Sequence, residues 1–409
     1  ANSYSGATTI SSGTLQIGSG GTSGSLGTGA VVDNGALAFN RSDAITIANS
    51  ISGSGSLTQA GAGTTVLTGA NSYSGATTIS SGTLQVGSGG TSGSLGTGAV
   101  VNNGTLAFNR SDVTTIANNV SGSGALTQMG AGTTMLTGAN SYSGATTINS
   151  GTLQVGSGGT SGALGAGAVV NNGTLSFNRS DVITIANNVS GSGALTQMGA
   201  GTTILTGANS YSGATLINSG ALQIGAGGMS GSLGSGVVVN NGALIFNRAG
   251  DVVVANTISG AGAVSILGEG TTVFTGANTF SGGTTVGVGA MLSIPSSIAL
   301  GSGSLVLAGG ASVPASLKVT GTTTINNAVS VSGDPVFDIA AGATATISNP
   351  IVNGASAGDV VVQGGGALAL AAVNAYTGST TVAAGSTLAL RGAGSIAASA
   401  GVANNGALD

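Results

Sequence analysis

Half of the charged side chains in this chain belong to one recurring motif, and these are the residues whose type and spacing could do chemistry. The 409-residue sequence has only 6 Lys and Arg, 10 Asp and Glu, and no His. In four places an arginine and an aspartate follow a Phe-Asn step, and the fourth copy reads Phe-Asn-Arg-Ala-Gly-Asp. The candidate residues are Arg41 and Asp43, Arg110 and Asp112, Arg179 and Asp181, and Arg248 and Asp251.

Two interpretations of this Arg–Asp motif are open. Each pair can be a local ion pair that keeps an exposed loop soluble, and such surface pairs add little to stability. Alternatively, the four pairs can form a row of surface-interaction sites, for a ligand or for self-recognition. We favour the local ion pair.

The other polar residues give little support for catalysis. There is no His to exchange protons near neutral pH, and no Cys. Polysaccharide-degrading enzymes need paired carboxylates about 5–10 Å apart, whereas Asp334 and Asp338 are interpreted as part of a solvated loop. The single lysine, Lys318, does not complete a phosphate-binding loop. We therefore expect no catalytic residue, no metal site, no cofactor and no enzymatic activity.

A long internal repeat must position these groups. Tyr4, Tyr73, Tyr142, Tyr211 and Phe280 follow one another at a constant interval of 69 positions. A fixed period of this kind indicates units that stack on their own copies. We assign residues 1–289 to tandem repeats and 290–409 to divergent coils that continue the same structure.

Within each repeat, short segments of the form Gly-x-Leu-x-apolar indicate β-strands. They start at residues 13, 35, 55 and 82, so we expect about three coils per repeat, each about 23 positions long. Alternation places Leu15 and Ile17 inside the coil and Thr14 and Gln16 outside. Gly-Ser-Gly-Gly and Asn-Asn-Gly sequences supply the corners, where residues that adopt positive φ are expected. The repeated Tyr and Phe are interpreted as core or corner residues rather than as a carbohydrate-stacking track.

Composition limits the partners. The formal net charge is −4 and no basic patch is present, so we expect neither nucleic acid nor an anionic membrane surface as a partner. No apolar run approaches the length of a membrane-spanning helix, so we expect no membrane insertion by this segment. Both ends of the sequence lie inside a repeat, and we expect the chain to be part of a longer protein.

The repeat resembles a known family, the autotransporter-associated β-strand repeat, also called the passenger-associated transport repeat. The resemblance rests on Gly-Ala-Gly-Thr-Thr-x-Leu-Thr-Gly-Ala-Asn-Ser-Tyr-Ser-Gly-Ala-Thr-Thr-Ile-x-Ser-Gly-Thr-Leu-Gln-Val-Gly and on the segment 95–108. It implies an all-β, right-handed parallel β-helix (β-solenoid) in an autotransporter passenger domain. The implied partner is the protein's own C-terminal outer-membrane β-barrel, and the implied location is the bacterial cell surface.

Three functions follow from these observations. The first is a non-catalytic stalk or adhesin segment that supports export and projects or forms an adhesive cell-surface fibre. The second is direct self-association of the coils on neighbouring cells, in aggregation or biofilm, or their binding to host or matrix surfaces. The third and remote alternative is a polysaccharide-degrading β-helix enzyme.

Overall fold

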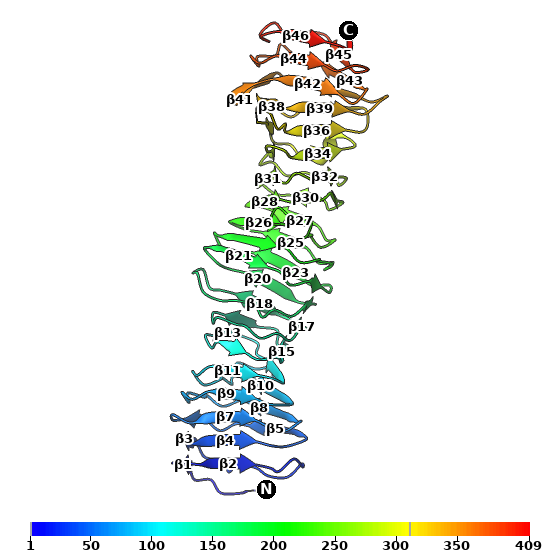
Figure 1. Cartoon of the computed structure of the whole chain (residues 1–409). Helices are drawn as coiled ribbons and strands as arrows, with labels where there is room; N and C mark the ends of the chain where they lie inside the picture. The colour runs from blue at the N-terminus through cyan, green and yellow to red at the C-terminus, as the bar shows by residue number, and fades with distance from the viewer. Residues whose placement is uncertain (1, 311) are drawn as a thin grey trace. The chain divides into compact units, whose positions relative to one another are not determined.

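The regular secondary structure of the chain consists almost entirely of short parallel strands, which stack coil upon coil and are joined by turns and irregular segments (Figure 1). The computed structural model describes residues 2–310 and 312–409. Within them there is one helical element, the 3₁₀ turn η1 (Ser297–Leu300). The prediction of an all-β parallel solenoid is confirmed. No helix in this described part is long and apolar enough to cross a bilayer.

Contacts divide the chain into two compact units. The first comprises residues up to Asp181 together with Ala186–Gly201, and the second comprises Val182–Ile185 with Thr202–Asp409. The boundary suggested by the repeat pattern, between residues 289 and 290, stays a prediction.

Every repeat between residues 8 and 205 supplies eight strands. The first repeat contains β1 (Thr8–Ile10), β2 (Thr14–Ile17), β3 (Val31–Asp33), β4 (Ala36–Phe39), β5 (Ala44–Ile47), β6 (Ile51–Ser52), β7 (Ser56–Gln59) and β8 (Thr64–Leu67). The second contains β9 (Thr77–Ile79), β10 (Thr83–Val86), β11 (Val100–Asn102), β12 (Thr105–Phe108), β13 (Val113–Ile116), β14 (Val120–Ser121), β15 (Ala125–Gln128) and β16 (Thr133–Leu136). The third contains β17 (Thr146–Ile148), β18 (Thr152–Val155), β19 (Val169–Asn171), β20 (Thr174–Phe177), β21 (Val182–Ile185), β22 (Val189–Ser190), β23 (Ala194–Gln197) and β24 (Thr202–Leu205).

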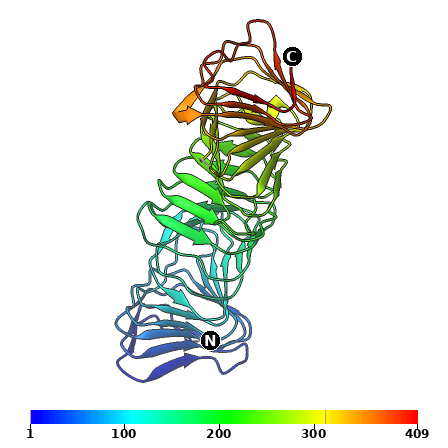
Figure 2. The same cartoon turned by 45° about the horizontal axis from the view of Figure 1, so that its top comes forward.

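The backbone ladder between neighbouring coils sets the coil length. β5 pairs with β8, β8 with β10, and β10 with β12, and the paired residues are 20, 19 and 22 positions apart. A coil is therefore shorter than the spacing of the Gly-x-Leu segments suggested, and each repeat holds slightly more than three coils. Figure 2 shows the strands of successive coils lying one above another in the N-terminal part of the first unit.

One repeat spans about three and one-third coils. Besides its eight strands it has two segments outside any strand, 23–27 and 70–74, which take strand positions; Ser72 N–H, for example, donates to the Ile51 carbonyl of β6. The eight strands and two segments make ten strand positions per repeat. Each coil has three such positions, one on each face, so a repeat fills three coils and leaves one position over. Equivalent strands therefore move to the next face: β2 pairs with β4, β10 with β8 and β12, and β18 with β16 and β20, in three different sheets.

The core consists of rows of identical or similar side chains. Leu84, Leu106 and Leu126 are register neighbours on β10, β12 and β15, and all three are fully buried. The predicted alternation is confirmed in pattern, since Ile17 is buried and Leu15 half-buried while Thr14 and Gln16 are exposed. Burial of such aliphatic side chains contributes roughly 1.5–3 kcal/mol each. Stacking of coils thus supplies both the hydrogen bonds and the apolar contacts.

The two predicted kinds of corner differ in mechanism. In Gly-Ser-Gly-Gly, Gly18 and Gly20 adopt φ of 84° and 92°, as expected. The expectation of positive φ at Asn-Asn-Gly is wrong, because no non-glycine residue in the described chain has positive φ and Gly104 does not either. Gly104 is needed for another reason: a Cβ there would lie 2.5 Å from the Gly82 carbonyl oxygen of the preceding coil.

The second unit contains the strands of the fourth repeat and of the divergent segment. Besides β21 and β24 they are β25 (Thr215–Ile217), β26 (Ala221–Ile224), β27 (Val238–Asn240), β28 (Ala243–Phe246), β29 (Val252–Val254), β30 (Ile258–Ser259), β31 (Ala263–Ile266), β32 (Thr271–Phe274), β33 (Thr284–Val286), β34 (Met291–Ile294), β35 (Leu305–Ala308), β36 (Ser316–Val319), β37 (Thr323–Ile325), β38 (Val329–Gly333), β39 (Val336–Ile339), β40 (Thr344–Ile347), β41 (Ile351–Gly358), β42 (Val360–Gln363), β43 (Ala367–Leu370), β44 (Thr380–Val382), β45 (Thr387–Leu390), β46 (Val402–Asn404) and β47 (Ala407–Leu408). Parallel pairing runs across residue 290, where β32 pairs with β34 and β33 with β35.

A charge placed inside a coil should unfold it. Leu153 of β18 is fully buried and lies between Thr134 and Leu175 in the ladder. Leu153→Asp should destabilise by more than the roughly 2–5 kcal/mol of a Leu→Ala change, because it also buries a carboxylate. Thermal melting checks this, with Thr152→Asp on the outward side of the same strand as control. Equal melting of the two variants would refute the assigned inward face.

One buried position differs between repeats in a way that predicts a pH effect. Asn102, Asn171 and Asn240 are fully buried, and each donates through Nδ2 to a carbonyl of the next coil at 2.8 Å. The first repeat has Asp33 here, also fully buried. Its Oδ1 accepts from Gly35 N–H at 3.0 Å, but its Oδ2 has no partner among the described residues. Burial raises the pKa of Asp33 above the usual 3.8.

Asp33→Asn should therefore stabilise the protein at neutral pH. Because the folded pKa of Asp33 is raised, its favourable contribution is complete below pH 3.8 and is lost as the pH rises through the folded pKa. We expect a gain of roughly 1–3 kcal/mol at pH 7, where the buried carboxylate is replaced by a donor, and little gain at about pH 3. Calorimetric melting of both proteins at the two pH values measures this difference. A gain that is the same at both pH values would contradict the assignment.

Candidate functional site

The Arg–Asp motif occupies the corner between two strands of a coil. Arg41 lies two residues after β4, and Asp43 directly precedes β5. The corresponding corners in the next two repeats follow β12 and β20. The tight connection holds the two side chains of each pair close together.

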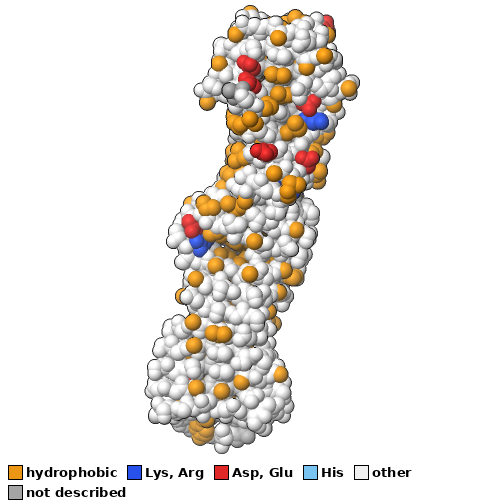
Figure 3. Space-filling view, viewed as in Figure 1, with side chains coloured by type: hydrophobic (Ala, Val, Ile, Leu, Met, Phe, Trp, Pro, Cys, Tyr) orange, Lys and Arg blue, Asp and Glu red, His pale blue; other side chains and the backbone are white. Residues whose placement is uncertain are grey.

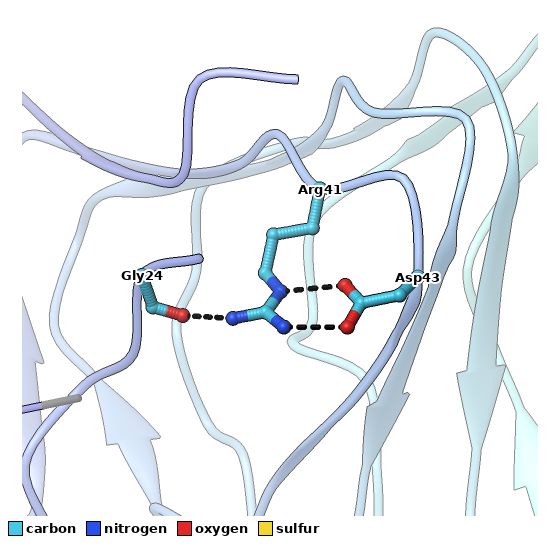
Figure 4. A network of polar contacts seen from close by, with 3 residues as sticks. All are labelled: Gly24, Arg41 and Asp43. Carbon is cyan, nitrogen blue, oxygen red and sulfur yellow. Dashed lines mark hydrogen bonds and ion pairs between the residues drawn. The ribbon is translucent and has the colours of Figure 1, made fainter. Parts of the chain in front are cut away.

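In the first repeat the arginine bonds in two directions (Figure 4). Its Nε and Nη2 donate to the two carboxylate oxygens of Asp43 at 2.8 and 2.7 Å. Its Nη1 donates to the backbone carbonyl of Gly24, 17 positions earlier in the chain. The arginine side chain is only 13% exposed, against 38% for the aspartate. We call this three-residue arrangement the arginine clamp.

The clamp recurs in the next two repeats with nearly the same geometry. Arg110 donates to Asp112 at 2.9 and 2.6 Å and to the Gly93 carbonyl. Arg179 donates to Asp181 at 2.8 and 2.6 Å and to the Gly162 carbonyl. These bidentate contacts have a fixed orientation, unlike a loose surface ion pair.

Electrostatics favour the ionised pair. The hydrogen bonds from arginine hold the pKa of Asp43, Asp112 and Asp181 below the usual 3.8. The pKa of Arg41 is raised by the same contact. A lowered folded pKa means that the contribution of each carboxylate is present above pH 3.8 and is lost as the pH falls through the folded value. The stabilisation from the clamps is thus lost as the pH falls, whereas the favourable contribution of the buried Asp33 is lost as the pH rises.

The fourth copy is altered. Gly250 stands where the first three repeats have the clamp aspartate, and the acid is one residue later, at Asp251. Arg248 still donates to the Gly231 carbonyl, and also to that of Met229 at 2.7 Å. Its buried Nε, however, has no partner in the described part of the chain. Asp251 instead accepts from Thr271 N–H at 2.8 Å.

The clamps do not form the row that one sequence interpretation required. Within the first unit they follow β4, β12 and β20, which lie in three different sheets. The reason is the leftover third of a coil, which turns each repeat onto the next face. The less favoured alternative, a row of aligned sites, does not fit this arrangement within the first unit, while a surface role for the individual residues stays a prediction.

An asparagine that was not predicted from the sequence acts together with the clamp. Asn49 donates to the carbonyls of Gly27 and Gly29 at 2.8 and 2.6 Å. Asn118 does the same for Gly96 and Gly98 at 2.9 and 2.6 Å. The recurring Ala-Asn step after an Ile-ending strand was the available signal.

The tyrosines of the 69-residue series are internal except Tyr4 in the first coil, which is 42% exposed. Tyr73, Tyr142 and Tyr211 are fully buried, and each hydroxyl lies 2.7 Å from the hydroxyl of the threonine four positions later. Desolvation raises the pKa of all three. The interpretation as core residues is confirmed, and a stacking track for sugars on these rings is excluded.

Comparison with known proteins agrees with the repeat architecture. Residues 1–17, 57–86, 126–155, 195–224, 267–291 and 360–390 match the family described as Passenger-associated-transport-repeat. These segments are similar to passenger-associated transport repeats. A stretch of 62 residues is 53% identical to the Adhesin BmaC autotransporter of Brucella suis biovar 1 (strain 1330), covering 15% of this chain and 2% of that protein. No solved structure matches the chain.

The matched segments and the clamps occupy different parts of each repeat. The segment 57–86, for example, holds β7 to β10 and Tyr73. Arg110, Asp112 and Gly93 fall between this segment and the next, which starts at residue 126. The matched segments therefore cover part of the stacked core, and the clamp lies in the spacers between them, which also supply core residues such as Leu106.

Restoring the clamp in the fourth repeat should stabilise the second unit. A side chain at position 250 would meet only the flexible end of Met229, at 2.8 and 3.0 Å, and the φ of Gly250 is not positive. Gly250→Asp should therefore place a carboxylate beside Arg248 and raise the melting temperature by a few degrees at pH 7. Gly250→Asn is the matched control, and a gain of the same size in that variant would rule out the ion pair as the cause.

Proposed function

We propose that this chain is a non-catalytic stalk or adhesin segment of a bacterial autotransporter passenger, displayed at the cell surface. The observation that carries the proposal is a surface of repeated, small and mostly neutral side chains. Figure 3 illustrates it on one face, where charged side chains are few and scattered. The clamp arginines turn their donors inward to carbonyls of the chain. The described repeated coils do not concentrate the unlike polar groups that an enzyme site needs.

The name of the Brucella suis relative and the repeats support this proposal at the level of class. In the longer protein, the partner would be the chain's own C-terminal outer-membrane β-barrel. Coils that stack outside the cell would also support export, because each added coil buries apolar rows and opposes sliding back. Binding to host or matrix surfaces is included in the proposal.

A second candidate is direct self-association of the coils in cell–cell aggregation or biofilm. The near absence of surface charge favours it, because two such surfaces repel each other little. Many weak contacts along repeated coils would add up to useful avidity without one strong site.

Two measurements on the purified chain separate these candidates. Analytical ultracentrifugation over a wide concentration range reports association, and aggregation of beads coated with the chain reports adhesion. Concentration-dependent dimers with clumping beads would support self-association. A monomer on beads that remain dispersed, yet bind cells or matrix, would support the stalk or adhesin. Beads that neither clump nor bind any surface would overturn the adhesive role.

A further inference from the structure

In the part of the chain that the structure describes, one edge of β5 has no strand partner. Asp43 and Ile47 accept hydrogen bonds from Thr64 and Thr68, so these alternate residues face β8. Because alternate residues of a parallel strand face opposite sides, Ile45 also faces β8, whereas Ala44 and Thr46 direct N–H and C=O to the other side. Among the described residues, none hydrogen-bonds the backbone N–H or C=O of Thr46. The segment on that side, 25–28, bonds instead to the coil before it, where Thr28 N–H donates to the Tyr4 carbonyl at 3.0 Å.

A groove of about 240 Å³ lies between this edge and the segment. The clamp closes one end, since Arg41 binds the Gly24 carbonyl, and Asn49 closes the other at Gly27 and Gly29. We call it the edge groove. It is lined by Ser25, Leu26, Gly27, Thr28 and by Ile45, Thr46, Ile47, Ala48, Asn49.

The second repeat has the same edge groove. There β13 is the edge strand, the volume is about 190 Å³, and the lining residues are the equivalents 69 positions later. Arg110 and Asn118 close its ends. Thr115 takes the place of Thr46, again with no hydrogen-bond partner for its backbone among the described residues. The groove occurs in two repeats, with an arginine and an asparagine at its ends in both, so it is a recurring structural feature of the repeat.

The lining defines the chemistry of an occupant. It contains no charged residue, so phosphates and carboxylates find no counter-charge. Buried Leu26 and Ile47 form an apolar floor, while the strand edge offers donors and acceptors side by side. At about 30 Å³ per water molecule the space holds roughly six to eight waters. This is below the roughly 300–1,000 Å³ of pockets for drug-sized ligands, and the closed ends prevent an extended peptide from running through.

We propose that each edge groove binds one neutral hexopyranose residue of a glycan. Sugar hydroxyls both donate and accept, so they can complete the hydrogen bonds of Thr46 or Thr115, while the ring lies over the apolar floor. This inference deepens the proposed adhesin function and rests on it. Because β5 and β13 belong to different sheets, the two grooves open on different faces, which suits branched or layered glycans that surround the protein.

Single-cysteine reporters test the proposal, because the chain has no cysteine of its own. Thr46→Cys and Thr115→Cys place a thiol at the two grooves. Val101→Cys is the matched control, since Val101 is exposed on β11, which is paired on both edges. Iodoacetamide alkylation rates are measured with the methyl glycosides of glucose, galactose, mannose and N-acetylglucosamine. At least one glycoside should slow both groove reporters twofold or more, saturably, and leave the control unchanged.

A groove-filling variant adds a second condition. Ile45→Trp in the Thr46→Cys background should abolish the protection while thermal melting reports an intact fold. If no glycoside slows the groove reporters up to about 100 mM, a hundredfold above a dissociation constant of about 1 mM, the groove holds water alone and the proposal fails. Equal slowing of Val101→Cys would overturn it too. If the coated beads still bind surfaces in that case, the proposed adhesive function stands and only the edge groove is excluded as its binding site.

Discussion

The parallel backbone ladder between coils is the constraint on which the rest of this structure depends. Pairing partners lie 19 to 23 positions apart in the first two repeats and up to 25 apart in the divergent segment, because each coil must return every strand to its neighbour in register. The sequence period, which is the interval from Tyr73 to Tyr142, is not a whole number of such coils. In a duplicated unit, each strand therefore lies on the next face of the stack relative to its equivalent in the preceding repeat. Every other feature of the repeat changes face in the same way.

The same constraint explains why the clamp exists. Where a side of the coil has no strand, as at 23–27, the ladder cannot satisfy the carbonyls that face the next coil. Arg41 and Asn49 supply side-chain donors to three of those carbonyls, and Asp43 fixes the arginine in the direction required. The fourth repeat keeps the arginine but loses the aspartate at that position, and a buried Nε remains unpaired among the described residues. The arginine holds the two coils together, and the aspartate keeps it oriented.

Strand positions, inward rows and buried tyrosines were predictable, because alternation and spacing are encoded locally in residues such as Leu15 and Ile17. The coil length was not, because only the strands with a Gly-x-Leu start were counted. Segments 23–27 and 70–74 take strand positions without a Gly-x-Leu start, although burial alternates along 70–74. The partner of Arg41 was also hidden, since a glycine carbonyl 17 positions away leaves no mark in the sequence. Asn102 illustrates a third limit: its type suggested a turn, whereas its buried amide bonds the next coil.

Rotation of the repeat also bears on how such a surface can bind. A surface patch that recurs on successive faces cannot meet one flat partner at every repeat; the same face returns only after three repeats, or ten coils. Avidity against a flat partner would then grow slowly with repeat number, whereas a partner that surrounds the coils could use every copy. The edge grooves share this property, because the residues that form them lie in the spacers that turn with the repeat. A glycan layer is a partner of the second kind, so the geometry of the repeat and the chemistry of the groove favour the same class of ligand.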